Sequence, residues 1–445
     1  MAGVRPPGPY PIPGISMESW IVRFDKNGVC TSPKTRDALL DNVAGKKDQP
    51  IIFFSHGWNN DFADATDLYR RFLTEFEQVL KAHPLSGPSP IFVGLTWPSI
   101  WLPSDAGPVM AGATVDAAAV AMNEAVLREI LDALPPTTDR SRLYALLEAD
   151  KISVKEAQEL ARLLAPALNP GKQEGPEETQ ADEANIVGAI SDLQRAGDGK
   201  PSDDDIDAIG TVGGAGSADL ATAGLLDFLD PRNAIRLASL YLMKDRAGAV
   251  GANGAAALLR GLLQKSQAPL YVIGHSFGCK VVMSALAADP KPGRKVRSAL
   301  LLEPAISYLS FAETVPGRDG PGGYRPVLDL VETPVFSTYS ASDFPLHSIY
   351  HLALLRRKDL GEAQIAAQVT TAGNPPNVYA ALGGYGPRGS NESLIEPIPR
   401  PGEDFNYPEK ARVVGFDGSI GNRIDSHGGV ANPCTAWVLR QQMSH

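Results

Sequence analysis

Cysteine, long apolar runs and positive charge are all scarce in this chain of 445 residues. The 3 cysteines, Cys30, Cys279 and Cys434, are odd in number and far apart, which argues against a disulfide framework. No apolar run approaches the roughly 20 residues that a membrane-spanning helix needs. The first residues are rich in Pro and Gly and lack the apolar stretch of a signal peptide. We therefore expect a soluble protein of a reducing cytoplasm.

The charge balance is acidic and uneven. Lys and Arg number 41 against 51 Asp and Glu, a net charge of −10. Residues 172–207 alone hold eleven acids and three bases, so most of the acidic excess lies in one tract. A protein that binds nucleic acid needs a basic face, and therefore no nucleic-acid partner is expected. Apolar residues make up 43% of the chain, enough for a packed core, while 43 Gly and 37 Pro predict long loops.

Short apolar runs alternate with amphipathic stretches in residues 1–99 and 240–445. A helix is expected over residues 62–80, where apolar side chains recur every three or four positions. Such alternation of strands and helices is typical of a parallel sheet covered by helices on both faces. The expected strands lie at residues 19–24, 50–54, 91–95, 269–273, 298–302, 333–340 and 411–416.

Residues 100–239 interrupt this alternation with helical stretches and spacers, and no strand is expected there. Ser153 and Glu156 form a capping box that opens an amphipathic helix. The acidic and Gly-rich middle cannot build a core and is expected to be a solvated connector. Because ligands bind at the carboxyl edge of such sheets, we expect a helical cap whose apolar side chains line the pocket mouth. Those side chains are Leu160, Leu163, Leu164, Leu168, Leu225, Leu226, Phe228 and Leu229.

The segment Gly274-His275-Ser276-Phe277-Gly278 fits the pattern G-x-S-x-G. It lies between an expected buried strand and an expected helix. In that setting the serine occupies a sharp turn that needs small residues at positions 274 and 278, and its hydroxyl stands above the sheet. The N-terminus of the following helix then favours a negative charge developing beside it. Ser276 is therefore the candidate nucleophile.

With this motif the chain resembles the α/β-hydrolase superfamily. Within it, the chain is most similar to an uncharacterised bacterial branch with H-G-(F/W/Y)-N-N, a strand ending in W-P-S, and G-H-S-x-G. Here His56 and Gly57 open the first motif, and W-P-S stands at 97–99. The resemblance covers residues 1–99 and 240–445 and not the insertion. It implies a mostly parallel central sheet flanked by helices, and an oxyanion held by the backbone N–H groups of Trp58 and Phe277.

The resemblance also implies a base and an acid for Ser276. The base is His427, between the last strand and the last helix, and the acid is Asp343, just after the strand at 333–340. Serine, acid and histidine then follow one another in the chain order that this fold requires. Two alternatives stay open. Glu303, which ends the strand at 298–302, is a second candidate acid, and His427 has the alternative role of capping the last helix.

A Ser-His-Asp constellation predicts a serine hydrolase that cleaves carboxylic esters through an acyl-enzyme. In the family, a single glycine followed by a bulky residue in the oxyanion loop accompanies lipase-like substrates, which favours a lipophilic ester. No metal or cofactor is expected; the expected partner is a small-molecule ester, and the oligomeric state stays open. Thioester or amide hydrolysis and acyl transfer use the same residues and remain alternatives, as does a non-catalytic interaction protein on a hydrolase scaffold.

Overall fold

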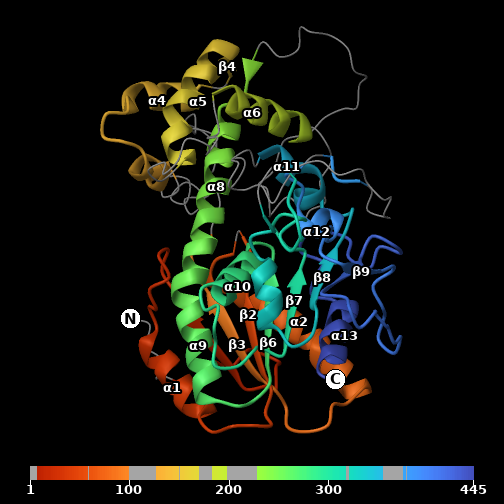
Figure 1. The fold of residues 1–445 in the computed structure, drawn as a ribbon. Helices are drawn as coiled ribbons and strands as arrows, with labels where there is room; N and C mark the ends of the chain where they lie inside the picture. The colour runs from red at the N-terminus through yellow and green to blue at the C-terminus, as the bar shows by residue number, and fades with distance from the viewer. Residues whose placement is uncertain are drawn as a thin grey trace.

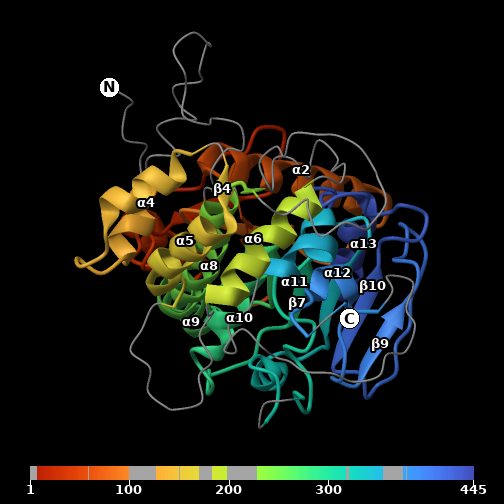
Figure 2. The same ribbon diagram turned by 90° about the horizontal axis from the view of Figure 1, so that it is seen from above.

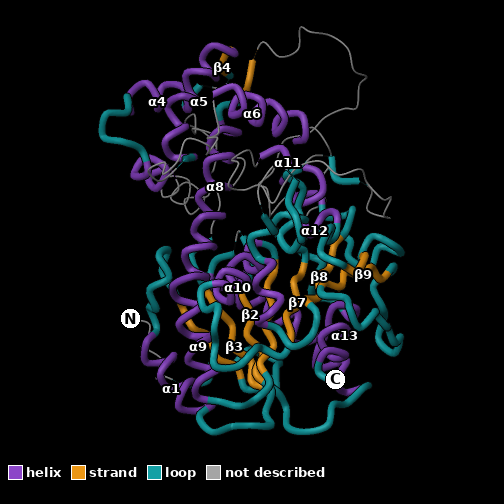
Figure 3. Tube along the Cα trace, in the orientation of Figure 1, coloured by secondary structure: helices purple, strands orange, loops and turns teal. Residues whose placement is uncertain are grey.

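The computed structural model describes residues 8–58, 60–99, 127–149, 151–169, 183–197, 228–316, 320–353, 374–376 and 378–444. A lower part built around a sheet is joined to a helical upper part by one long helix (Figure 1). The strands lie at the centre of the lower part, with helices in front of and behind them (Figure 3). Among the described residues, no helix combines the length and the apolar character needed to cross a membrane.

Eight strands form one sheet in the order β1-β3-β2-β6-β7-β8-β10-β9. Each neighbouring pair runs parallel, as the alternating sequence pattern predicts. The four-residue strand β9 is not among the strands expected from the sequence, because its side chains are only half buried and form no apolar run. The bounds are β1 Ser19–Arg23, β2 Ile51–Ser55, β3 Ile91–Thr96, β6 Leu270–His275, β7 Ser298–Leu302, β8 Val335–Tyr339, β9 Glu392–Ile395 and β10 Val413–Asp417.

Both faces of the sheet are buried. Successive side chains along a strand point to opposite sides, so each strand contributes to two apolar cores. Phe53 belongs to one apolar core and its neighbour Phe54 to the other. The Phe53 face is covered by α1 (Pro33–Val43), α9 (Ala256–Lys265) and α10 (Phe277–Ala287). The Phe54 face is covered by α2 (Phe62–Ala82) and α13 (Pro433–Gln442), which pack on each other. Figure 2 shows α2 and α13 on the opposite side of the sheet from α9 and α10.

Helix α8 (Arg232–Val250) connects the sheet to the upper part. From α8 the chain stays helical through one π-helical turn, η1 (Gly251–Ala255), into α9. Gly251 permits this, because a Cβ there would collide with the backbone of Val281 on α10. Two short segments flank the sheet, the 3-10 turn η2 (Arg325–Leu330) and the π-helical turn η3 (Pro345–Ile349).

Short helices lie beyond the carboxyl ends of the strands (Figure 1). They are α4 (Arg140–Leu147), α5 (Val154–Leu168), α6 (Glu183–Gly197), α11 (Tyr350–Ala353) and α12 (Leu382–Tyr385). We call the described residues between 127 and 239 the cap. Within the cap, β4 (Ile152–Ser153) pairs antiparallel with β5 (Phe228–Leu229).

Two expectations about the cap are wrong. A strand pair exists where none was predicted, because two-residue strands leave no alternating pattern to read. Part of the acidic tract, expected as a solvated connector, is the helix α6. It packs on α5 and α8 through the buried side chains of Ile186, Ala189 and Ile190. Its acids lie among apolar residues at helical spacing, so the net charge of the tract masked an amphipathic helix.

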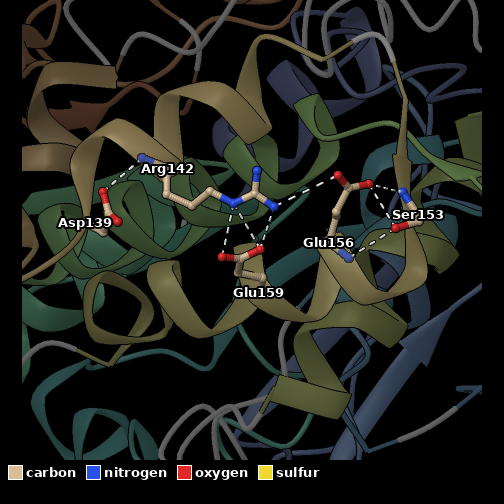
Figure 4. Close-up of polar contacts among 5 residues, drawn as sticks. All are labelled: Asp139, Arg142, Ser153, Glu156 and Glu159. Atoms are coloured by element: carbon tan, nitrogen blue, oxygen red, sulfur yellow. Dashed lines mark hydrogen bonds and ion pairs between the residues drawn. The ribbon is translucent and has the colours of Figure 1, made fainter.

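Polar contacts within the cap connect α4 to the start of α5 (Figure 4). The predicted capping box is present: the Ser153 hydroxyl accepts the Glu156 N–H at 3.3 Å, and the Glu156 carboxylate accepts the Ser153 N–H at 2.9 Å. Arg142 of α4 reaches Glu159 of α5, with Nη2 2.7 Å from Oε2. Both partners of this ion pair are solvent-accessible, so water and salt screen it. The capping box therefore contributes more to the start of α5 than the ion pair does.

We expect Ser153→Ala to weaken the start of α5, since it leaves a backbone N–H without its partner, at a cost of about 1 kcal/mol. Hydrogen exchange of the amides in the first turn of α5 should become faster. Glu159→Gln, which removes only the screened ion pair, is the matched control and should leave exchange in that turn nearly unchanged. Equal effects of the two changes would contradict this ranking.

Candidate active site

The candidate site lies where the sheet changes its direction of winding. From β2 the chain moves to β3 on one side, and after the cap it returns to β6 on the other side of β2. Such a switch point leaves a crevice at the carboxyl ends of the strands, where ligands bind in open α/β sheets. Ser55, the last residue of β2, is paired in register with Gly274 near the end of β6. The two motif segments that follow these strands are thus neighbours in space.

Ser276 occupies a strained turn between β6 and α10. Its φ of 54° and ψ of −125° lie in a region that costs a non-glycine residue about 1–3 kcal/mol. The turn is held by backbone hydrogen bonds: the Ser276 N–H donates to the Leu302 carbonyl at 3.1 Å, and the Ser276 carbonyl accepts from Ala305 at 3.2 Å. The residue is 1% exposed and lies directly at the N-terminus of α10, which no side chain caps.

Two glycines allow the β2 turn to approach Ser276. A Cβ at Gly57 would lie 2.5 Å from the Cβ of Ser276, and a Cβ at Gly278 would overlap the Ser55 carbonyl oxygen. Any side chain at either position would push the β2 turn away from α10. Trp58, next to Gly57, and Phe277, next to Ser276, therefore flank the serine, with ring centroids 5.7 Å apart. These are the two residues whose N–H groups were expected to hold an oxyanion.

The predicted base, His427, and the predicted acid, Asp343, are hydrogen-bonded to each other. His427, in the loop between β10 and α13, has its Nδ1 2.7 Å from Oδ2 of Asp343, which follows β8. Because a carboxylate only accepts hydrogen bonds, the imidazole carries its proton on Nδ1. The other carboxylate oxygen of Asp343 accepts the Leu346 N–H at 2.9 Å. Asp343 is fully buried and His427 is 7% exposed. The pair is therefore shielded from solvent.

The alternative acid, Glu303, does not take this place. Its carboxyl group is fully buried and lies against Asp343 rather than against the His427 ring. Both of its oxygens lack an N–H or O–H donor within the described residues. Burial, and next the negative charge of Asp343, raise the pKa of Glu303 well above its usual range.

The histidine that precedes Ser276 supports the His427 loop. Nε2 of His275 lies 2.9 Å from the backbone carbonyl oxygen of His427, to which it donates. Burial and the nearby His427 ring lower the pKa of His275 well below its usual range, so the ring is neutral. The sequence analysis named His275 only as part of the G-x-S-x-G motif. Its support of the His427 loop was missed, because the two residues are 152 positions apart and no local pattern indicates their contact.

His56 positions the turn after β2. Its Nε2 accepts the Trp97 N–H at 3.2 Å, so the proton is on Nδ1, which donates to the Gly57 carbonyl at 2.8 Å. The ring stacks on Trp97 at 5.4 Å between centroids. Farther along the same two turns, the Ser99 hydroxyl donates to the Asn60 carbonyl at 3.0 Å and accepts the Asn60 N–H at 3.2 Å. His56, Gly57, Asn60, Trp97 and Ser99 thus belong to one hydrogen-bonded unit.

A pocket connects these residues. Ser276 and His427 both line it, and most of its remaining wall is apolar. The cap contributes Leu193 of α6 and Arg236 and Leu237 of α8, and the opposite side is formed by η3 and α11. Arg236 adds one cation, whose Nη1 donates to Asn233 at 2.7 Å. The cap residues that line the pocket are thus not the ones that the sequence indicated.

The expected side chains that the structure describes do not line the pocket. Leu160, Leu164 and Leu168 of α5 are buried inside the cap, where α5 packs on α6 and α8. Leu163 is half buried against that core, and Leu229 of β5 belongs to it. Leu225 and Leu226 lie outside the described residues, as does the side chain of Phe228. A helical apolar face does not reveal which neighbour it will pack on, and α6 separates α5 from the cavity.

We expect the stability of the fold to fall as the pH drops from about 6.5 to about 4, partly through His56. Burial lowers the pKa of His56 from 6.5 to about 4. Between these values the unfolded chain binds a proton that the folded chain does not, so the free energy of unfolding rises with pH. His56→Gln keeps one donor and one acceptor but cannot titrate, so it should reduce this slope in urea unfolding series. The pKa values of His275 and His351 are lowered too, so these two residues should preserve part of the slope in the variant. An unchanged slope would contradict the prediction.

Comparisons of the chain with known protein families, with curated proteins and with solved structures find no match. The architecture is an α/β sheet of parallel strands covered by helices on both faces. The serine turn, the buried histidine–aspartate pair and the apolar cavity at its carboxyl edge are the features from which a function follows.

Proposed function

We propose that this chain is a serine hydrolase of the α/β-hydrolase fold that cleaves carboxylic esters through an acyl-enzyme. The observation that carries the proposal is the arrangement around one cavity. Ser276 and His427 line the same apolar pocket, and the imidazole is held from behind by the buried Asp343. The chain order of serine, acid and base, and their positions after β6, β8 and β10, agree with that fold.

Each residue then has a defined part in the reaction. Ser276 Oγ attacks the ester carbonyl carbon while Nε2 of His427 takes the hydroxyl proton. Asp343 keeps the imidazole in the tautomer with its proton on Nδ1 and stabilises the imidazolium that forms. The N–H groups of Trp58 and Phe277 would hold the oxyanion, and the N-terminus of α10 adds a favourable field. Proton return from His427 releases the alcohol, and water activated by the same base hydrolyses the acyl-enzyme.

The pocket favours an apolar acyl group. Its wall combines aromatic side chains of the sheet domain with leucines from α6 and α8, and a buried alkyl chain gains roughly 0.8 kcal/mol for each methylene. Thioesters, amides and acyl acceptors other than water fit the same chemistry and are compared directly in the experiments. A non-catalytic protein would have no use for a strained serine beside a buried histidine–aspartate pair, so we favour the hydrolase.

We expect Ser276→Ala to abolish turnover of p-nitrophenyl esters and labelling by a fluorophosphonate probe. The hydroxyl contributes little to packing, so thermal unfolding should change little. Asp343→Asn should lower kcat by about 10⁴-fold, because the imidazole then adopts the wrong tautomer. Ser284→Ala on the same helix is the matched control, since Ser284 bonds only to the Tyr324 hydroxyl in the described contacts and lies outside the pocket.

Turnover by Ser276→Ala within about tenfold of the wild type would rule out this nucleophile. Wild-type protein that neither reacts with the probe nor hydrolyses any ester, thioester or amide of a test series would support the non-catalytic alternative.

We expect Leu237→Phe to change the preference for acyl-chain length. The larger side chain fills part of the cavity wall. Long-chain p-nitrophenyl esters should lose about tenfold in kcat/KM relative to the acetate, a loss typical of one or two methylenes without room. Leu242→Phe, on the same helix but away from the cavity, is the matched control. The same ratio of long-chain to acetate activity in both variants would show that the cap does not select the acyl group.

A further inference from the structure

A second buried acid lies at the carboxyl edge of the sheet, next to the proposed triad. Glu303 follows β7 directly and has a φ of 41°, a conformation rare for a residue with a side chain. Its backbone N–H donates to Oγ1 of Thr338 on the neighbouring strand β8, at 2.9 Å. This contact fixes the backbone at the end of β7, and the carboxyl group lies against Asp343, which follows β8.

The surroundings of this carboxyl group are unusual for a charged side chain. The groups that act on it are the carboxyl groups of Asp343 and Asp417, the Thr338 hydroxyl and the Cys279 thiol. None of these is a cation. A buried carboxylate normally requires a cation or several hydrogen-bond donors, and within the described residues both oxygens of Glu303 lack a donor.

Two carboxyl groups in contact in such a place cannot both be ionised, so one proton is shared between them. The hydrogen bonds decide which group keeps it. Asp343 accepts from Nδ1 of His427 at 2.7 Å and from the Leu346 N–H at 2.9 Å, and both donors stabilise its charged form. Glu303 has no comparable donors, since only the Thr338 hydroxyl favours its charged form, while burial and Asp343 act against that form more strongly. The proton therefore belongs on Glu303.

We propose that Glu303 is a positioning residue that stays protonated and donates its proton as a hydrogen bond to Asp343. The role of the bond rests on the proposed hydrolase function. With it, the Asp343 carboxylate is held by three donors and cannot rotate away from His427. The site also carries a single negative charge behind the imidazole rather than two. Glu303 touches neither substrate nor reacting atoms and acts only through Asp343.

Two substitutions of similar size separate this role from the alternatives. Glu303→Gln keeps a neutral side chain with a donor, so kcat should stay within about threefold of wild type. Glu303→Met has similar length and no donor, so kcat should fall by about 10- to 100-fold with little change in KM, as expected when a hydrogen bond to a charged group is lost. Recovery by Gln relative to Met is a result that mere packing would not produce.

The pH profile gives a second readout. The acid limb of kcat/KM reports protonation of the base. If Glu303 is neutral, Gln carries the same charge and the limb stays in place. If Glu303 is ionised, Gln removes a negative charge near His427, and the limb should move to lower pH.

Infrared spectroscopy tests the proton itself without turnover. Wild-type protein at neutral pH should show the carbonyl band of a protonated carboxylic acid, retained in Ser276→Ala and missing in Glu303→Gln. Absence of this band from the wild type, or a Glu303→Met variant with wild-type kcat, would overturn the proposal. A Glu303→Gln variant as inactive as Asp343→Asn would do so too and would make Glu303 the acid. Failure of the fluorophosphonate to label wild-type protein would overturn the hydrolase function instead, while the band would still decide where the proton lies.

Discussion

The close packing of the β2 turn on the Ser276 turn is the constraint on which the rest of the site depends. It requires glycine at 57 and 278, because a side chain at either position would occupy the space of the opposite backbone. It also requires that the polar groups of the turn be satisfied without water. His56 does this by accepting the Trp97 N–H and donating to the Gly57 carbonyl, while the Tyr69 hydroxyl accepts the His56 N–H at 2.9 Å. The β2 turn is therefore rigid before any ligand binds.

Three histidines in this region have three different tasks because their surroundings differ. His56 and His275 are buried without a carboxylate and stay neutral, so each serves as a fixed donor to a backbone carbonyl. His427 alone combines a carboxylate on one nitrogen with a place in the cavity wall. This combination separates the candidate base from its neighbours in the same motifs.

The cap is part of the site rather than an addition to it. Helix α8 runs from the sheet into the cap, and Arg246 near its lower end donates to the Pro98 carbonyl at 2.9 Å and pairs with Glu129. The turn after β3 is thus connected both to α8 and, through Arg246, to Glu129 of the cap. Leu237, two and a half turns farther up α8, lines the cavity. Helix α8 therefore fixes the position of the cavity wall relative to the end of β3.

The sequence by itself determined the features that depend on local pattern. These are the buried strands, the amphipathic helix α2, the capping box at Ser153 and the turn at Ser276 between a strand and a helix. Each follows from residues a few positions apart. The tertiary structure alone decided which acid contacts His427, where Glu303 turns, that α6 folds within the acidic tract and that α6 and α8 line the cavity instead of α5. These features depend on contacts between residues tens to hundreds of positions apart, which the local spacing of apolar and polar residues does not encode.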